Sequence, residues 1–198
     1  TTMAEKIRNV LFLCTGNSAR SILAEALMNK AGQGRFRAFS AGSFPKGEVH
    51  PMALEVLRDA GLPTEGYRSK SWDEFTGPEA PEMDFIFTVC DSAAGESCPI
   101  WAGHPTTAHW GIEDPAAIEG PQQKQAFFTA LTYLKTRISL FLALPIDDLD
   151  EMALETKLRA IGRSEGATGN AAADNQGLGV NIVHQSPLFG NGNHTLKG

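Results

Sequence analysis

The sequence predicts an α/β fold in which helices flank a four-stranded parallel sheet in a three-layer arrangement. Short apolar runs alternate along the chain with stretches of helical periodicity, and this alternation is typical of parallel sheets covered on both faces. Cysteines follow directly after two of the apolar runs, at the strand ends where ligands bind in such sheets. The length of 198 residues suffices for one domain with a buried core and a short appendage.

The predicted strands are short apolar runs, and the helices between them carry their apolar residues on one face. The strands cover residues 8–14, 36–41, 84–90 and 108–112. The helices cover residues 21–31, 51–61 and 123–144. We expect one domain at 4–145, followed by an extra C-terminal helix at 146–163 that is capped by the acidic pair at 147–148.

The composition is that of a globular protein with an acidic surface. The chain is 42% hydrophobic and 20% charged with a formal net charge of −6, so we expect neither nucleic acid nor a membrane as its partner. No apolar stretch approaches the roughly 20 residues that span a bilayer, and no signal-peptide pattern is found. The cysteine count of three is odd, which is poor for a disulfide framework and suits a reducing compartment. We therefore expect a cytoplasmic location.

The segment 14–21 reads Cys-Thr-Gly-Asn-Ser-Ala-Arg-Ser and joins an apolar run to a helical stretch. A loop in this position presents successive backbone N–H groups and a helix N-terminus to one small space, which favours anion binding. Arg20 adds a planar two-toothed donor for an oxyanion, and Cys14 supplies a sulfur nucleophile. The positive field predicts that the pKa of Cys14 falls from about 8.5 into the range of about 3.5–7.5. Ser21 can donate its hydroxyl hydrogen to this sulfur.

Two further cysteines and an acid follow the later strands. Cys90 ends the third apolar run, and Cys98 follows in a segment of small residues that can rearrange. Asp114 precedes a proline in the loop after the last strand, where it is a candidate proton donor. Asp-Pro pairs are also common in turns, so a purely structural role for this aspartate stays open.

Taken together, the segments 14–21, 90–98 and 109–116 resemble those of the thiol-dependent arsenate reductases, which share the fold of low-molecular-weight protein tyrosine phosphatases. The resemblance runs from about residue 8 to residue 144 and weakens through residue 163. It implies reduction of arsenate to arsenite by three cysteines, without a tightly bound cofactor or metal. It also implies an external dithiol, thioredoxin or a comparable thiol donor, as the source of electrons.

The resemblance gives each candidate residue a role. Cys14 attacks arsenate, Arg20 holds the arsenate oxygens, and Asp114 protonates the departing hydroxide. Cys90 then attacks Cys14 and releases arsenite, and Cys98 attacks Cys90 to form a disulfide that the donor reduces. The oxyanion-binding loop comprises Thr15, Gly16, Asn17, Ser18, Ala19 and Arg20.

The chain departs from the family pattern at two places. Seven residues separate Cys90 from Cys98, where similar reductases usually have six. Some relatives also hold a monovalent cation beneath the loop. The groups that match this cation site are Asn17, Glu25 and Ser40. A further carboxylate of that site is replaced here, and we expect the ammonium of Lys70 to take the place of the ion.

Two other functions stay open. A phosphatase of the same fold would form a phosphocysteine on Cys14, although such enzymes place aromatic residues where this chain has Ala116 and Ala117. We expect weak phosphatase activity in any case, because the anion loop is shared. A zinc-binding regulatory module is the second alternative, although the two later cysteines are spaced widely for zinc ligands. Its candidate ligands are Cys90, Cys98, His104 and His109.

Residues 164–198 are rich in glycine, asparagine and alanine, a composition typical of a flexible tail or a partner-dependent arm. We expect the removal of this tail to leave the chemistry intact, because every candidate group lies before Pro115. The tail is a candidate for joining two copies of the chain.

Overall fold

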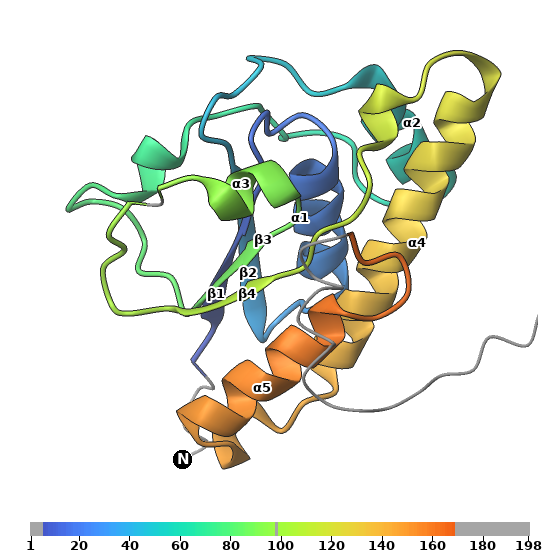
Figure 1. Cartoon of the computed structure of the whole chain (residues 1–198). Helices are drawn as coiled ribbons and strands as arrows, with labels where there is room; N and C mark the ends of the chain where they lie inside the picture. The colour runs from blue at the N-terminus through green and yellow to red at the C-terminus, as the bar shows by residue number, and fades with distance from the viewer. Residues whose placement is uncertain (1–5, 98, 169–198) are drawn as a thin grey trace, which may run out of the picture.

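The computed structural model describes residues 6–97 and 99–168. Residues 1–5, Cys98 and residues 169–198, and with them most of the expected tail, lie outside this description. The strands are β1 (Arg8–Leu13), β2 (Phe36–Ala41), β3 (Phe85–Thr88) and β4 (Thr106–His109). The α-helices are α1 (Arg20–Ala31), α2 (Pro51–Asp59), α3 (Asp91–Gly95), α4 (Gln123–Leu142) and α5 (Glu151–Gly162). The predicted fold class is confirmed (Figure 1).

The strands form one sheet of four parallel strands in the order β2-β1-β3-β4. Leu13, the last residue of β1, lies opposite Ala41 of β2 and Thr88 of β3. Thr88 in turn lies opposite His109, the last residue of β4. All four strands therefore end at the same edge of the sheet, and the segments that follow them meet there, as the rule for open parallel sheets requires.

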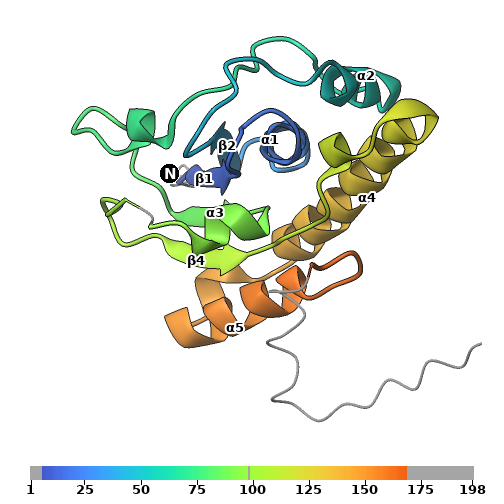
Figure 2. The same cartoon turned by 45° about the horizontal axis from the view of Figure 1, so that its top comes forward.

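Alternate residues of the strands enter two separate layers. Val10 and Phe12 face the larger core, in which α1 and α4 pack together and α5 lies against β4 (Figures 1 and 2). Phe87 stacks on Trp110 in that core, with ring centroids 3.9 Å apart. The opposite face is covered by aromatic side chains of β2, of the long β2–β3 connection and of the segment before β4. They are Phe39, Trp72, Phe75 and Trp101.

The last strand begins and ends earlier than the sequence suggested. We expected residues 108–112, but β4 ends at His109, and the next three residues form a buried loop. The apolar signal at Trp110 comes from a ring that is buried in the core. The Nε1 of this ring donates to Leu158 O of α5 at 3.0 Å. The apolar signal of Ile112 likewise comes from a buried loop position and not from strand pairing.

The extra C-terminal helix is present, but a different residue caps it. Asp150 is its N-cap, and the Asp150 carboxylate accepts from the Ala153 N–H at 2.8 Å. Asp147 and Asp148, the expected cap, belong to a separate 3₁₀ turn over Ile146–Asp148. Residues 164–168 continue from the helix back to the sheet, where the Thr168 N–H donates to Gly111 O at 3.2 Å. The boundary expected at residue 164 therefore falls inside a segment that contacts the domain.

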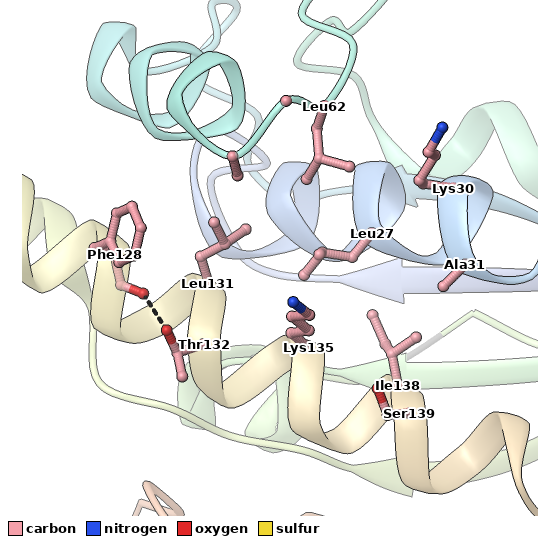
Figure 3. Close-up of a pocket in the computed structure, with 12 residues that line it drawn as sticks. Leu27, Lys30, Ala31, Leu62, Phe128, Leu131, Thr132, Lys135, Ile138 and Ser139 are labelled. Carbon is pink, nitrogen blue, oxygen red and sulfur yellow. Dashed lines mark hydrogen bonds between the residues drawn. The ribbon is translucent and has the colours of Figure 1, made fainter.

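An apolar groove of about 350 Å³ lies between α1, α4 and the segment after α2 (Figure 3). Leu27, Leu62 and Leu131 point into it, and Phe128 at its rim is 42% exposed. None of the predicted site residues lines this groove. Across the described ranges, no helix has the length and apolar character needed to cross a membrane.

Candidate active site

The loop that follows β1 is held rigidly from below by Asn17. This residue is 0% exposed and has a positive φ of 41°, a conformation that asparagine tolerates better than most residues. Its Nδ2 donates to Ser21 Oγ and to Ser40 Oγ, each at 2.9 Å. Its Oδ1 accepts from the Lys70 N–H at 2.9 Å. One buried side chain thus ties the loop to α1, to β2 and to the β2–β3 connection.

The loop also lies directly on the backbone that leaves β2. A Cβ atom placed on Gly42 would lie 2.4 Å from Thr15 O and 2.9 Å from Cys14 O, so only glycine fits there. Cys14 itself is buried, and its N–H donates to Ala41 O at 3.2 Å. The strand end and the loop are therefore fixed before any ligand binds.

The interior of the loop presents unpaired donors. Within the described part of the chain, the backbone N–H groups of residues 16–20 make no hydrogen bond. The Nε–H of Arg20 is buried and also lacks a partner among these residues. Backbone N–H groups gathered at the start of a helix, together with a guanidinium, form a site for an anion. Orphaned donors of this kind are costly in a folded protein unless a ligand satisfies them.

Arg20 connects the loop to the predicted acid. Its Nη1 donates to Ile112 O at 2.8 Å, and its Nη2 lies 3.5 Å from Asp114 Oδ2. Asp114 Oδ1 accepts from the Ala116 N–H at 3.2 Å, so this carboxylate also caps the 3₁₀ turn at Pro115–Ala117. Asp114 can therefore cap the turn and also act as the proton donor, because Oδ1 accepts from Ala116 while Oδ2 faces Arg20.

Cys90 lies against the start of the loop. Its sulfur accepts from the Thr15 N–H and from the Ala93 N–H, each at 3.4 Å, and Cys90 lines the same cavity as Cys14. The hydrogen bond from Cys14 is the largest cause that lowers the pKa of Cys90 to about 5, and the backbone donors add to it against the effect of burial. Cys90 is therefore a thiolate at neutral pH.

The pKa shifts thus favour the thiolate on Cys90, whereas we expected it on Cys14. The hydrogen bond to Cys90 and burial raise the pKa of Cys14 well above its ordinary value, and Arg20 only partly opposes them. Two interacting thiols titrate as a pair, and the two backbone donors to the Cys90 sulfur favour the negative charge there. The Ser21 hydroxyl accepts from Asn17 Nδ2, which leaves its hydrogen available, so the expected donation to the Cys14 sulfur stays a prediction.

A cavity of about 220 Å³ opens over the two sulfurs. Most of the predicted site residues line it, and so does Ala116, one of the two alanines that stand where phosphatases of this fold place aromatic residues. Two residues that were not candidates, Lys46 and Ser92, line it as well. Lys46 comes from the segment after β2, where its N–H donates to Gly16 O at 3.0 Å. No spacing in the sequence links it to the loop, so only the fold could reveal it.

The residues matched to a cation site lie together beneath the loop. Ser40 Oγ, which accepts from Asn17, donates to Glu25. Lys70 Nζ lies 3.9 Å from Glu25 Oε2 and donates to Arg68 O at 3.0 Å. Burial raises the pKa of Glu25 and lowers the pKa of Lys70, and each charge partly offsets the shift of the other. An ammonium group thus stands beside the carboxylate.

The zinc alternative finds no support in the described residues, in which no three His, Cys, Asp or Glu side chains are grouped to hold a metal. His109 instead lies between Thr88 and Asp91. Cys98, which the zinc and the relay hypotheses both use, is outside the described residues.

Comparisons with known proteins give a consistent result. The model of the low molecular weight phosphotyrosine protein phosphatase family matches residues 9–152. An arsenate reductase of Bacillus licheniformis is 35% identical over 123 residues, which are 61% of this chain and 84% of the relative. Arsenate reductase 2 of Staphylococcus haemolyticus is 31% identical over 133 residues, covering 66% of this chain and 98% of the relative.

A solved structure described as an arsenate reductase in the phosphate binding state is also similar. It is 26% identical with a TM-score of 0.58, and the match covers 69% of this chain and 98% of that chain. The family match covers more than half of the chain and includes the loop, both described cysteines and Asp114. The chain therefore belongs to the low molecular weight phosphotyrosine protein phosphatase family.

Proposed function

We propose that this chain reduces arsenate to arsenite through its cysteines, with thioredoxin or a comparable dithiol as the electron donor. The observation that carries the proposal is that two cysteines, Cys14 and Cys90, line one anion cavity, and that the Cys90 sulfur accepts from the N–H of Thr15, the residue after Cys14. A hydrolase that acts through a phosphocysteine needs no second thiol there. The curated relatives named arsenate reductases support the same conclusion.

In the first step, arsenate enters the cavity and its oxygens accept from the loop N–H groups and from Arg20. The Cys14 proton passes to Cys90 along their hydrogen bond, and the Cys14 sulfur attacks arsenic. A sulfur–arsenic bond forms and an arsenic–oxygen bond breaks. The oxygen leaves as water after it takes a proton from the carboxyl group of Asp114.

In the second step, the proton on Cys90 passes to an arsenic-bound oxygen, and the Cys90 thiolate attacks the sulfur of Cys14. The electron pair of the sulfur–arsenic bond stays with arsenic, which leaves as arsenite, and a Cys14–Cys90 disulfide remains. Cys98 then attacks Cys90, which returns Cys14 as a thiolate and forms a Cys90–Cys98 disulfide. The external dithiol reduces this last bond and is itself oxidised.

Serine variants of the three cysteines test the sequence of steps. Cys98→Ser is expected to release about one arsenite per enzyme and to trap the Cys14–Cys90 disulfide, because the third sulfur is missing. Cys90→Ser is expected to stop before arsenite release. Cys14→Ser is expected to lose all activity, because a serine hydroxyl is too weak an acid to pass its proton to Cys90 and cannot form a disulfide. Arsenite assay and peptide mapping without reductant distinguish these states.

Hydrolysis of an aryl phosphate serves as the matched control, because it needs the Cys14 sulfur but no disulfide. Without Cys90 the largest cause that raises the pKa of Cys14 is removed, so the Cys14 thiol should ionise without a proton acceptor. We expect Cys90→Ser and Cys98→Ser to retain it. Normal turnover of Cys98→Ser with thioredoxin would contradict the three-cysteine relay. Aryl phosphate hydrolysis by the wild type in the absence of any arsenate reduction would identify the chain as a phosphatase.

We infer further that the Lys70 ammonium supplies the positive charge that a monovalent cation supplies in some relatives. Its place beside Glu25, at 3.9 Å, supports this substitution. Arsenate turnover should then be the same in potassium and in tetramethylammonium salts. Lys70→Met should lower turnover, and a strong response of the wild type to potassium would contradict the inference.

A further inference from the structure

The chain beyond α5 contacts the first residue of α3, the short helix that directly follows Cys90. Thr168 Oγ1 donates to Asp91 Oδ1 at 2.6 Å, and the Thr168 N–H donates to Gly111 O at 3.2 Å. Asp91 directly follows Cys90 and is the first residue of α3. Gly111 lies in the loop that leads to Asp114. One residue of the C-terminal appendage therefore contacts both segments that carry the proposed chemistry.

The same carboxylate oxygen of Asp91 also receives a second partner. His109 Nε2 lies 2.7 Å from Asp91 Oδ1, and the other ring nitrogen, Nδ1, lies 2.7 Å from Thr88 Oγ1. Burial opposes ionisation of Asp91, but the hydrogen bonds from Thr168 and His109 outweigh it and lower the pKa of this carboxyl. The bonds to Asp91 are therefore charge-assisted and stronger than neutral ones. We refer to Thr88, Asp91, His109 and Thr168 as the Asp91 network.

The Asp91 network is tightly packed. A Cβ on Gly111 would lie 2.4 Å from Thr168 Oγ1, 2.5 Å from His109 Nε2 and 2.6 Å from Asp91 Oδ1. A Cβ on Gly162, at the end of α5, would lie 2.1 Å from His109 O. The appendage can approach the sheet this closely only because two glycines leave the space.

A buried arginine fixes the appendage from the other side. Arg137 of α4 is 0% exposed, and its guanidinium lies 3.5 Å from each of three carbonyl oxygens. These belong to Trp110, Gly111 and Glu165. Burial lowers the pKa of Arg137 to about 10, and the guanidinium forms no ion pair among the described side chains. Because a buried charge needs polar partners, the Glu165 carbonyl holds the appendage in place.

We propose that Thr168 and Asp91, supported by His109, position α3 so that Cys90 is presented to Cys14 for the second step of the proposed arsenate reduction. The short α3 has one buried residue, Ala93, to hold it by packing. The Asp91 network fixes it at its first residue instead, next to the sulfur. The family match ends at residue 152, so Thr168 lies outside the matched part of the chain.

The full-length variants Thr168→Val and Thr168→Ser test this positioning role. Valine keeps the shape and removes the hydroxyl, whereas serine keeps the hydroxyl. We expect Thr168→Val to slow single-turnover arsenite release about tenfold to a hundredfold, as the loss of one charge-assisted hydrogen bond predicts. The amides of Ala93 and Ala94 should exchange with deuterium faster by a similar factor. Thr168→Ser should restore both values.

The control is Thr156→Val, which removes an exposed hydroxyl that donates within α5 to Met152 O at 2.9 Å. It should leave release and exchange unchanged, and aryl phosphate hydrolysis should be unchanged in all three variants. Unaltered exchange of α3 in Thr168→Val would overturn the proposal. The exchange measurement uses no arsenate, so its result separates this proposal from a wild type that fails to reduce arsenate.

Discussion

The anion loop and helix α3 meet at the two sulfurs, yet they are held in opposite ways. The loop is fixed along its length by the buried Asn17 and by contact with Gly42. Helix α3 spans five residues and is held mainly at its first residue, Asp91. Fixed donors suit the binding of an oxyanion, because they need no rearrangement when charge develops. A weakly packed segment suits a sulfur that must exchange partners.

Arg20→Lys tests the rigid anion loop and should have the largest effect on activity. A lysine cannot reproduce the planar fork that reaches Ile112 O and Asp114. We expect arsenate reduction and aryl phosphate hydrolysis to fall together by about 10³-fold. Parallel steady-state assays measure both. A loss confined to arsenate reduction would show that Arg20 serves the thiols instead of the oxyanion.

Asp114→Asn should have the next largest effect. The amide can still accept from Ala116 and cap the turn, but it cannot supply a proton to the leaving oxygen. We expect about a 10²-fold fall in the rate constant of the first step for arsenate and for phenyl phosphate, whose leaving group needs protonation. Wild-type rates for phenyl phosphate in the Asp114→Asn variant would leave Asp114 with its capping role alone.

The fold and the substrate side of the site follow from local patterns in the sequence. The loop is contiguous, so Cys14, the backbone donors and Arg20 could be placed from spacing alone. Lys46 and the Asp91 network could not, because they join segments that only the sheet brings together. The expectation that residues from Ser164 onward are dispensable stays a prediction. The contacts of Thr168 could not be predicted, because a glycine-rich composition indicates flexibility and gives no sign of close backbone approach.

The opposite pKa shifts of Cys14 and Cys90 could not be predicted from the sequence for a related physical reason. Spacing reveals the positive field of the loop and of Arg20, both of which act on Cys14. It does not reveal that the Cys90 sulfur accepts from two backbone N–H groups in the folded chain. Direct hydrogen bonds to a thiolate outweigh a guanidinium that is turned toward other acceptors.

Gly42→Ala tests the rigidity of the loop with a smaller effect. The new methyl group would lie 2.4 Å from Thr15 O, so the loop must shift. We expect the free energy of unfolding to fall by about 1–3 kcal/mol and both activities to fall about tenfold. Gly77→Ala is the matched control, because a Cβ there meets nothing within 4 Å and should change neither value. Denaturant unfolding and steady-state assays give the two measurements.

The smallest expected effect is a shift in the pKa of Cys90, the cysteine that directly precedes helix α3. In a Cys98→Ser background, thiolate absorbance should appear as the pH rises through about 5, the pKa of Cys90, while Cys14 ionises only at strongly alkaline pH. Adding Cys14→Ser removes the thiol donor, so the pKa of Cys90 should rise toward its ordinary value. Adding Cys90→Ser should instead lower the pKa of Cys14, because its bond to a thiolate is lost.

The sign of the effect on stability follows from the same shift. The folded-state pKa of Cys90 lies below its ordinary value of 9.0, so ionised Cys90 contributes stability that is fully present above that ordinary pKa. This contribution is lost as the pH falls through about 5. Because the pKa of Cys14 shifts in the opposite direction, the contribution of Cys14 to stability is present below its ordinary pKa and declines at alkaline pH.

The titration also has an outcome that would contradict this assignment of charge. If the wild type showed no thiolate near neutral pH, Cys90 would not be the charged cysteine, and the relay would have to begin from a thiolate on Cys14.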